Sequence, residues 1–253
     1  MKPSDYVRLW RAFRRRLRSE RDCRKFQAFQ ARQILDYLVR HGVPIEGRFL
    51  LDLGSGVAGY SRVFARRGAC VIGIDLAHPR ESRIEGMSQV QASALAVPLR
   101  NESVDVIFCA SLIEHVAEPG VLLSEIERTL RAGGSCYISF PPYYSPIGGH
   151  EFSPFHYLGE RIAIRIVRHS AKVPGWVRQF YDLPEKTSSF SEAYGRWGLH
   201  KMTIAKFRRL LSSTKLVCLD TSTRYMPINF SGWPLVGEVL TWHAQFLLAK
   251  PRS

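Results

Sequence analysis

Residues Phe49–Tyr60 read Phe-Leu-Leu-Asp-Leu-Gly-Ser-Gly-Val-Ala-Gly-Tyr, and residues Val71–Asp75 read Val-Ile-Gly-Ile-Asp. A short apolar run enters a glycine turn, a helical run follows, and a second apolar run ends in an acid. This order is typical of a βαβ unit that holds a ligand at the carboxyl edge of its strands. Glycines suit such a turn because they tolerate positive φ and let a ligand approach the backbone closely.

The alternation of strand-like and helical runs continues beyond this unit. It predicts a parallel, doubly wound sheet with ligands at the carboxyl ends of the strands. We expect strands at 48–53, 70–74, within 88–98, at 104–110, 136–140, 216–219 and 241–249, helices at 59–67, 119–130, 158–170, 203–212 and 234–240, and a helix stop at 131–134.

Two further regions frame this pattern. Residues 1–47 predict two basic N-terminal helices, one from Ser4 to Arg24 and one from Arg24 to Arg40. About sixty residues separate the fifth strand from the helix at 203–212, which is too long for an ordinary connection. We therefore expect residues 48–253 to form one domain, with 142–200 as an insertion on the substrate side.

Composition bounds the setting of the protein. The net charge of +14 suits an anionic partner such as nucleic acid, an acidic membrane face or a phosphorylated substrate, although solubility alone explains it equally well. No run of about 18 uncharged apolar residues occurs, and the basic N-terminus has no apolar core of a secretory signal after it. None of the five cysteines has a metal-ligand spacing. These features favour a reduced, cytoplasmic location.

A basic stripe lies in the expected insertion. It consists of Arg161, Arg165, Arg168 and Lys172, at helical spacing, and it is followed by the aromatic residues Trp176, Phe180 and Tyr181. One interpretation is a solvated helix face. The other is an interfacial helix that docks on anionic lipid, which would place the protein peripherally at a membrane.

The two acids of the opening stretch narrow the ligand. Asp52 stands two residues before Gly54, where dinucleotide sites usually hold an apolar residue because a pyrophosphate would repel a carboxylate. A ligand with a cationic amino group or sulfonium would be favoured there instead. Asp75 closes the second strand, where an acid can bind both ribose hydroxyls. A ligand with a cationic end and a ribose but no phosphate is S-adenosylmethionine (SAM).

Four motifs in the expected order cover residues 49–140. They are Leu51–Gly56 with the later Asp75, Ser103-Val104-Asp105, Ile113-Glu114-His115-Val116, and Leu130-Arg131-Ala132-Gly133-Gly134. With these motifs the chain resembles a class I SAM-dependent methyltransferase of the broad type 11 group. The resemblance implies an α/β fold: a Rossmann-like seven-stranded, mostly parallel sheet with helices on both faces, whose seventh strand is reversed, here with N-terminal helices and an insertion after strand five.

The resemblance also implies cofactor contacts, position by position. It places the methionine part of SAM over Gly54, Ser55 and Gly56 with Asp52 nearby, the ribose on Asp75, the adenine against Leu76, Ser93, Ala94 and Leu95, and the methionine end beside Ala110 and Ser111. Many relatives carry an acid where this chain has Ser93. A hydroxyl or the Ala94 backbone therefore has to replace that contact with the adenine amino group.

The insertion and the chain's end resemble a poorly characterised bacterial methyltransferase subgroup. The matching segments are Pro146–Glu151, His156–Gly159 and Trp233-Pro234-Leu235. Some similar proteins belong to cell-surface glycan or lipid pathways. We therefore expect methyl transfer to an oxygen atom of a small-molecule, glycan or lipid acceptor.

Methyl transfer from a sulfonium depends mainly on in-line positioning, and a hydroxyl acceptor also benefits from a base. The candidate bases are His150, His156 and His115, with Glu151 as a partner, and each of these histidines could instead be structural. Their spacing matches no metal-binding pattern, so no metal is expected.

The alternatives differ in acceptor or in class. The charge permits a nucleic-acid methyltransferase, but Cys109-Ala110-Ser111-Leu112 lacks the Asn/Asp-Pro-Pro-aromatic motif of enzymes that methylate nucleic-acid amino groups. A SAM-binding protein without catalysis is a further alternative, although the intact acids and glycines argue against it. An NAD-linked oxidoreductase is disfavoured by Asp52.

Overall fold

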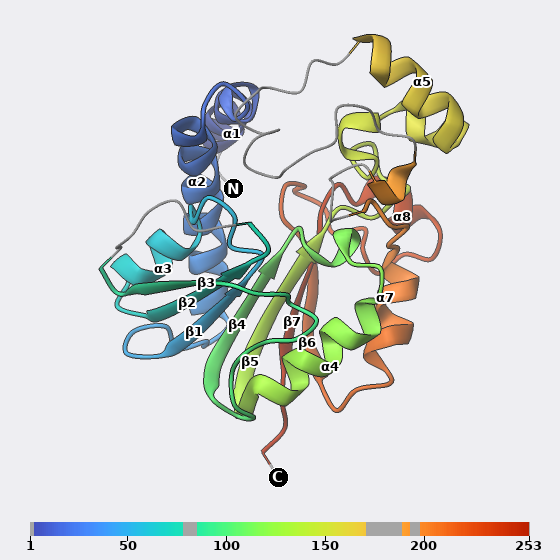
Figure 1. The fold of residues 1–253 in the computed structure, drawn as a ribbon. Coiled ribbons are helices and arrows are strands. Elements are labelled where there is room, and N and C mark those ends of the chain that lie inside the picture. The colour runs from blue at the N-terminus through green and yellow to red at the C-terminus, as the bar shows by residue number, and fades with distance from the viewer. Residues whose placement is uncertain (1–2, 78–84, 171–188, 193–197, 253) are drawn as a thin grey trace. The chain divides into compact units, whose positions relative to one another are not determined.

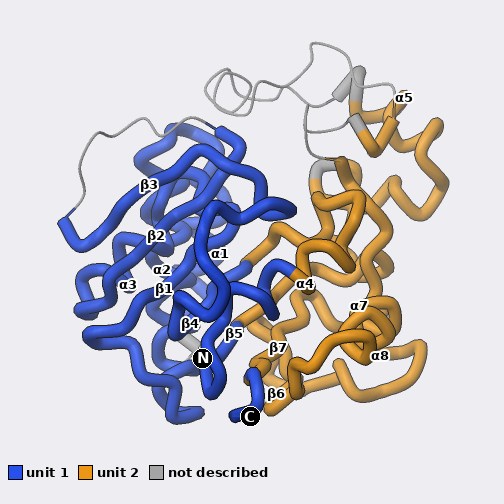
Figure 2. The backbone as a smooth tube through the Cα atoms, turned by 60° about the horizontal axis from the view of Figure 1, so that its bottom comes forward, with its two compact units in different colours: residues 1–109, 125–136, 250–253 blue, residues 110–124, 137–249 orange. Residues whose placement is uncertain are grey.

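The structure is a computed structural model that describes residues 3–77, 85–170, 189–192 and 198–252. Its contacts divide the chain into two compact units, which Figure 2 shows in two colours. Unit 1 contains residues 1–109, 125–136 and 250–253, and unit 2 contains residues 110–124 and 137–249. The glycine turn and the N-terminal helices thus fall in unit 1, and the histidines proposed for catalysis fall in unit 2.

Parallel strands form the centre of unit 1 (Figure 1). Strand β1 (Phe49–Leu53) pairs in parallel with β2 (Cys70–Asp75) and β4 (Val104–Ala110), and β2 pairs in parallel with β3 (Met87–Gln91). β1 and β4 are buried over nearly their whole length, which fits their continuous apolar sequence. Helix α3 (Ser61–Arg66) packs on β2 and β3, and α2 (Glu20–Arg40) packs on α3 and on α1 (Pro3–Arg15).

The remaining strands complete one sheet. The strand order is β3-β2-β1-β4-β5-β7-β6, with β5 at Leu130–Phe140, β6 at Val217–Thr223 and β7 at Ala244–Ala249. β6 and β7 are antiparallel. α4 (Pro119–Thr129) precedes β5, while α7 (Ile204–Leu211) and α8 (Val236–Leu240) belong to unit 2. The predicted Rossmann-like, mostly parallel seven-stranded sheet is confirmed.

The segment after β5 has a small core of its own within unit 2. It contains the short 3₁₀ helices η2 (His150–Phe152) and η3 (Phe155–Leu158), the helix α5 (Glu160–Ser170), and η4 (Phe190–Glu192). Their apolar side chains pack together: Phe152, Ala163, Ile164, Phe190 and Leu199 are buried in one cluster. This core fixes the backbone on which His150 and His156 are carried.

Two predicted boundaries were wrong. The helix before β5 ends at Thr129, close to the predicted stop, but residues 131–134 already belong to β5, because Gly133 N–H donates to the Lys250 carbonyl and Lys250 N–H donates to the Gly134 carbonyl. The first two helices meet near Ser19 and not at Arg24, because the Ser19 side chain accepts the Asp22 N–H and caps α2.

None of the helices within the described residues is both long enough and apolar enough to cross a lipid bilayer.

Candidate active site: a cofactor turn and a histidine cluster

The glycine turn after β1 is tied to the end of β2. Gly54 N–H and Ser55 N–H both donate to the Ile74 carbonyl, at 2.8 and 3.1 Å. Gly54 and Gly56 have φ of +74° and +49°, a region that residues with a Cβ rarely adopt. The glycine pattern is therefore required by the backbone of the turn, as the sequence predicts.

Asp52 is buried directly beneath this turn, with an exposed fraction of 1%. Burial raises its pKa to about 7, and the negative charge of Asp75 adds to the rise, while a hydrogen bond donated by the Ser61 hydroxyl opposes it. None of these influences is a cation. A ligand that brings a positive charge to Asp52 would therefore relieve an unfavourable local balance of charge.

Asp75 joins the two loops at the ends of β1 and β2. Its Oδ2 accepts the Gly56 N–H at 2.7 Å, and its Oδ1 accepts the Ala77 N–H at 2.8 Å. Burial raises the pKa of Asp75, while the hydrogen bonds from Ala77, Gly56 and Leu76 oppose the rise. Because each carboxylate oxygen can accept more than one hydrogen bond, both still have capacity for ribose hydroxyls.

The side chain of Ser55 is buried under the glycine turn. It is 2% exposed, and a Cβ added at Gly73 in β2 would come within 2.9 Å of its hydroxyl oxygen. The side chain thus packs under the turn against Gly73, and only the backbone of Ser55 remains to face a ligand. Gly73 was the sequence signal for this close approach.

The predicted adenine edge lies next to Asp75. Ala92 N–H donates to the Asp75 carbonyl at 3.0 Å, which holds the loop after β3 beside the end of β2. Ser93 Oγ accepts the Leu95 N–H at 3.1 Å, and Ser93, Ala94 and Leu95 are half-buried. The Ser93 hydroxyl therefore closes its own turn and keeps one lone pair and its proton for other contacts.

Sequence reasoning missed a contribution from α2. Gln27 Oε1 accepts the Gly59 N–H at 3.0 Å, and Gln30 Oε1 accepts the Tyr60 hydroxyl proton. Gly59 has no room for a side chain because a Cβ there would collide with Gln27. The N-terminal helices are thus attached to the glycine loop, and the third glycine of the motif was the only signal for it.

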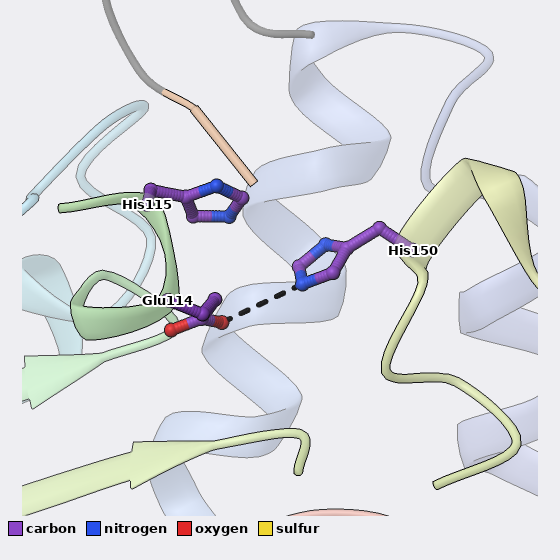
Figure 3. Close-up of side chains that lie close together, drawn as sticks. All are labelled: Glu114, His115 and His150. Atoms are coloured by element: carbon purple, nitrogen blue, oxygen red, sulfur yellow. Dashed lines mark ion pairs between the residues drawn. The ribbon is translucent and has the colours of Figure 1, made fainter. Parts of the chain in front are cut away.

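Unit 2 brings Glu114, His115 and His150 together, as Figure 3 shows. One ligand atom from each lies within 4.8 Å of the others. His150 Nε2 is 3.6 Å from Glu114 Oε1. The imidazole rings of His115 and His150 lie edge to face, with their centroids 4.8 Å apart. Glu114 was not among the predicted site residues, although it stands next to His115 in the sequence.

Glu114 is the most deeply buried member of this cluster. Glu114 is 2% exposed, and burial raises its pKa to about 7, with the charges of His115 and Arg224 acting in the opposite direction. Burial, together with the neighbouring His150, lowers the pKa of His115 to about 4. His115 Nδ1 donates to the Gly198 carbonyl at 2.8 Å, so its imidazole orientation is fixed.

His156 does not join this group of three. It is 2% exposed, its Nε2 donates to the Tyr143 carbonyl at 3.0 Å, and burial lowers its pKa. Its ring also packs against Tyr157 and against Gly149, where any Cβ would collide with the imidazole. These contacts give His156 a clear packing role. Glu151, its expected acidic partner, has no described side chain.

Ala110 is the last residue of β4, Ser111 follows it, and both belong to unit 2. Ser111 has a φ of +54°, and its N–H donates to the Ser139 carbonyl at 2.8 Å. Its hydroxyl lies 3.2 Å from Nε2 of the buried His243, and Arg224 Nη1 is 3.4 Å from the same nitrogen. Sequence reasoning missed His243 and Arg224 because they are distant along the chain from Ser111.

The basic stripe is only partly described. Arg161 and Arg165 are exposed on α5 beside Ile162, which is 50% exposed. The side chain of Arg168 and the residues Lys172, Trp176, Phe180 and Tyr181 lie outside the described part of the chain.

Part of the chain is similar in sequence to known proteins. Residues 51–138 match the family model of a methyltransferase domain. An uncharacterised methyltransferase of Mycobacterium leprae is 37% identical over 147 residues, which cover 54% of each chain. The chain thus spans about half the length of the curated relatives it matches.

Two solved structures share the fold. A 1,6-didemethyltoxoflavin-N1-methyltransferase of Burkholderia thailandensis, solved with S-adenosylhomocysteine, has a TM-score of 0.56 at 16% identity, covering 100% of this chain and 92% of that one. A putative SAM-dependent methyltransferase of Listeria monocytogenes has a TM-score of 0.55 at 15% identity, covering 85% and 97%. At these identities the likeness concerns the fold alone. Residues 51–138 are thus similar to a methyltransferase domain, and the chain has the fold of solved SAM-dependent methyltransferases.

Proposed function

We propose that the protein transfers a methyl group from SAM to an oxygen atom of a small-molecule, glycan or lipid acceptor. The observation that carries the proposal is the buried Asp52, which lies under a positive-φ glycine turn beside Asp75 and receives no compensating positive charge from its main neighbours. A cationic nucleoside without phosphate meets both requirements of this site, since a phosphate would add a third negative charge.

The chain's own residues would bind and orient the cofactor. Asp52 would neutralise its cationic end, the backbone of the 54–56 turn would lie against its methionine part, and Asp75 would accept the ribose hydroxyls. When bound, SAM supplies a methyl group on a positively charged sulfur. The protein then has to align the acceptor and keep water out, which accounts for most of the rate enhancement in such a transfer.

His150 is the strongest candidate among the three histidines for contact with the acceptor. His156 is buried by Tyr143, Tyr157 and Gly149, and His115 is fixed on the Gly198 carbonyl. The His150 side chain keeps an exposed fraction of 21% and follows a glycine pair in a tight turn. His150→Asn should lower methyl transfer while SAM affinity stays within about twofold, because the SAM-binding residues of unit 1 are untouched.

Isothermal calorimetry tests the cofactor assignment. Wild-type protein should bind SAM and S-adenosylhomocysteine and show little or no heat with NAD. Asp52→Ala should weaken SAM binding by about 100-fold, since a buried charge pair is lost. The matched control is Asp36→Ala, which removes an exposed acid from α2. SAM affinity unchanged by Asp52→Ala would remove Asp52 from the cofactor site.

The acceptor class is tested by incubating the protein with methyl-labelled SAM and fractionated cell material. Label is expected in lipid, glycan or small-molecule fractions, in a bond with the alkali and acid stability of a methyl ether or ester. Label in nucleic acid would favour the alternative acceptor. SAM binding without label in any fraction would favour a SAM-binding protein without catalysis.

We further propose that the basic face of α5 contacts an anionic membrane surface. Exposed arginines beside the exposed Ile162 support it, since this pairing is typical of interfacial helices. Arg161→Glu with Arg165→Glu should reduce flotation with anionic liposomes, whereas reversing the exposed Arg32 and Arg66 of unit 1 should not. Equal losses in both double variants would mean that net charge alone drives the attraction.

A further inference from the structure

The cluster of Glu114, His115 and His150 is not explained by methyl transfer as such. Glu114 and His115 come from the 3₁₀ helix after β4, and His150 comes from the segment after β5, more than thirty residues further along the chain. The three side chains face one another in Figure 3, with one donor atom of each within 4.8 Å of the other two. Two imidazole nitrogens and one carboxylate oxygen are a common ligand set for divalent transition metals.

The carboxylate is the first sign that something positive is needed here. Both oxygens of Glu114 are buried, and among the described residues neither accepts a hydrogen bond. Buried carboxylates are normally hydrogen-bonded, paired with a cation at contact distance, or bound to a metal.

His115 has the orientation that a metal ligand requires. Because a carbonyl oxygen can only accept, its contact of 2.8 Å with Gly198 fixes the imidazole proton on Nδ1 and makes Nε2 the coordinating nitrogen. The Glu114 carbonyl in turn accepts the His200 N–H at 2.8 Å, so residues 198–200 hold both neighbours in place. A carbonyl behind a ligating histidine is a typical supporting contact of metal sites.

His150 reaches the pair through a turn that is built for close approach. Cβ atoms at Gly148 and Gly149 would collide with the carbonyls of Pro142 and Tyr143 and with the His156 ring. His150 itself has a φ of +51°, a conformation that non-glycine residues seldom adopt. The backbone strain of this turn is consistent with selection for the position of the His150 imidazole.

We propose that Glu114, His115 and His150 bind one divalent transition-metal ion, such as Zn²⁺, and leave a coordination position open. Around such an ion the donor atoms are about 3.4 Å apart, given metal–ligand bonds of about 2.1 Å and tetrahedral geometry. The three side chains therefore have to close by about 1 Å, which small χ rotations provide. Hard cations that prefer all-oxygen sites, such as Ca²⁺ and Mg²⁺, fit this donor set poorly.

The open position would take water or an oxygen of the acceptor. The metal site itself is inferred from the cluster alone, whereas acceptor binding at the open position rests on the proposed function. A metal-bound hydroxyl ionises far more readily than a free one, so the site would favour an acceptor with a hydroxyl group. Among the acceptors of methyl transfer to oxygen, the site would thereby select those with a hydroxyl group.

The alternative is an ion pair between Glu114 and a protonated His150. It explains their separation of 3.6 Å, but it does not explain why the ring centroid of His115 lies 4.8 Å from that of His150. The metal site predicts that a divalent ion binds and that binding needs all three side chains. The ion pair predicts no such binding.

A titration of the EDTA-treated full-length chain with Co²⁺ separates them. Wild type should bind one Co²⁺ per chain and develop the visible d–d absorption of a four- or five-coordinate site. Glu114→Gln, His115→Asn and His150→Asn should each weaken binding at least about tenfold. His41→Asn, at the exposed end of α2, should bind like wild type and thereby control for loss of one histidine.

A second measurement needs no variant. One equivalent of Zn²⁺ should raise the unfolding temperature of the wild-type chain, and EDTA should reverse the shift. Absence of saturable Co²⁺ absorption together with no Zn²⁺ shift overturns the metal site. So does Co²⁺ binding that persists in all three ligand variants. SAM calorimetry on the same samples verifies their folding. A chain that binds Co²⁺ stoichiometrically but transfers no methyl group retains the metal site and loses only the proposed function.

Discussion

The glycine turn of unit 1 and the histidine cluster of unit 2 are built in opposite ways. The turn draws its chemistry from Asp52, Gly54, Gly56 and Asp75, which lie within one βαβ unit and at adjacent ends of paired parallel strands. The cluster joins residues from two distant 3₁₀ helices and is held by a third segment at 198–200. Backbone geometry thus specifies the first site, whereas tertiary packing of an insertion specifies the second.

The largest expected effect concerns the carboxylate that closes the turn. Asp75→Ala should lower the free energy of unfolding by about 3 kcal/mol, because it leaves two N–H groups, of Gly56 and Ala77, without acceptors. It should also weaken SAM binding at least 100-fold. Urea unfolding and calorimetry measure the two losses. Asp75→Asn retains one carbonyl acceptor and should lose about half as much stability. An Asp75→Ala protein with wild-type SAM affinity would contradict the ribose assignment.

This contrast explains how much the sequence could reveal. The sheet, the turn and the cofactor class follow from local rules: apolar strands, positive-φ glycines and acids at strand ends. For Ser55, the sequence predicts that its backbone lines the turn, but not that its side chain packs against Gly73. The participation of Glu114 could not be inferred, since nothing in the spacing of positions 114, 115 and 150 indicates that the chain returns to the same place. Lys250 likewise turned a predicted stop into a strand through a pairing across more than one hundred residues.

The second prediction tests whether unit 2 depends on close packing as the turn does. Gly148→Ala should lower the free energy of unfolding by about 2 kcal/mol, because its Cβ overlaps backbone carbonyls that cannot rotate away. SAM affinity should change little. Gly232→Ala is the matched control, since a Cβ there has nothing within 4 Å. Thermal or urea unfolding gives both values. Equal stabilities of the two variants would mean that the turn before His150 relaxes without cost.

The third prediction concerns pH and the buried acid. The pKa of Asp52 is raised to about 7 from its ordinary value of 3.8, so between these pH values the folded chain holds a proton that the unfolded chain has released. Its stabilising effect is complete below about pH 4 and is lost as the pH rises to about 7. SAM binding should show the reverse trend, because a cationic ligand prefers ionised Asp52. Affinity should rise by up to tenfold per pH unit between about 5 and 7 and then level off.

Calorimetry in buffers of different ionisation enthalpy measures the accompanying proton release. Asp52→Asn, which cannot ionise, should abolish both the pH dependence below 7 and the release of the proton. A wild-type affinity that stays flat from pH 5 to 8 would contradict the placement of the cationic end at Asp52.

The smallest expected effect tests whether α2 contributes to the cofactor site. Gln27 holds the Gly59 N–H from α2, so the N-terminal helices act on the glycine loop although they precede the βαβ unit. Gln27→Ala should lower the free energy of unfolding by about 1 kcal/mol and weaken SAM binding several-fold, because the loop loses one of its restraints. Arg32→Ala, at an exposed position of the same helix, should stay within about 0.5 kcal/mol of wild type. If the two variants bind SAM equally well, the helices only cover unit 1, and the site is confined to the residues that follow Phe49. If they differ as expected, even the locally specified site needs one long-range contact, and the difference between the two units is one of degree.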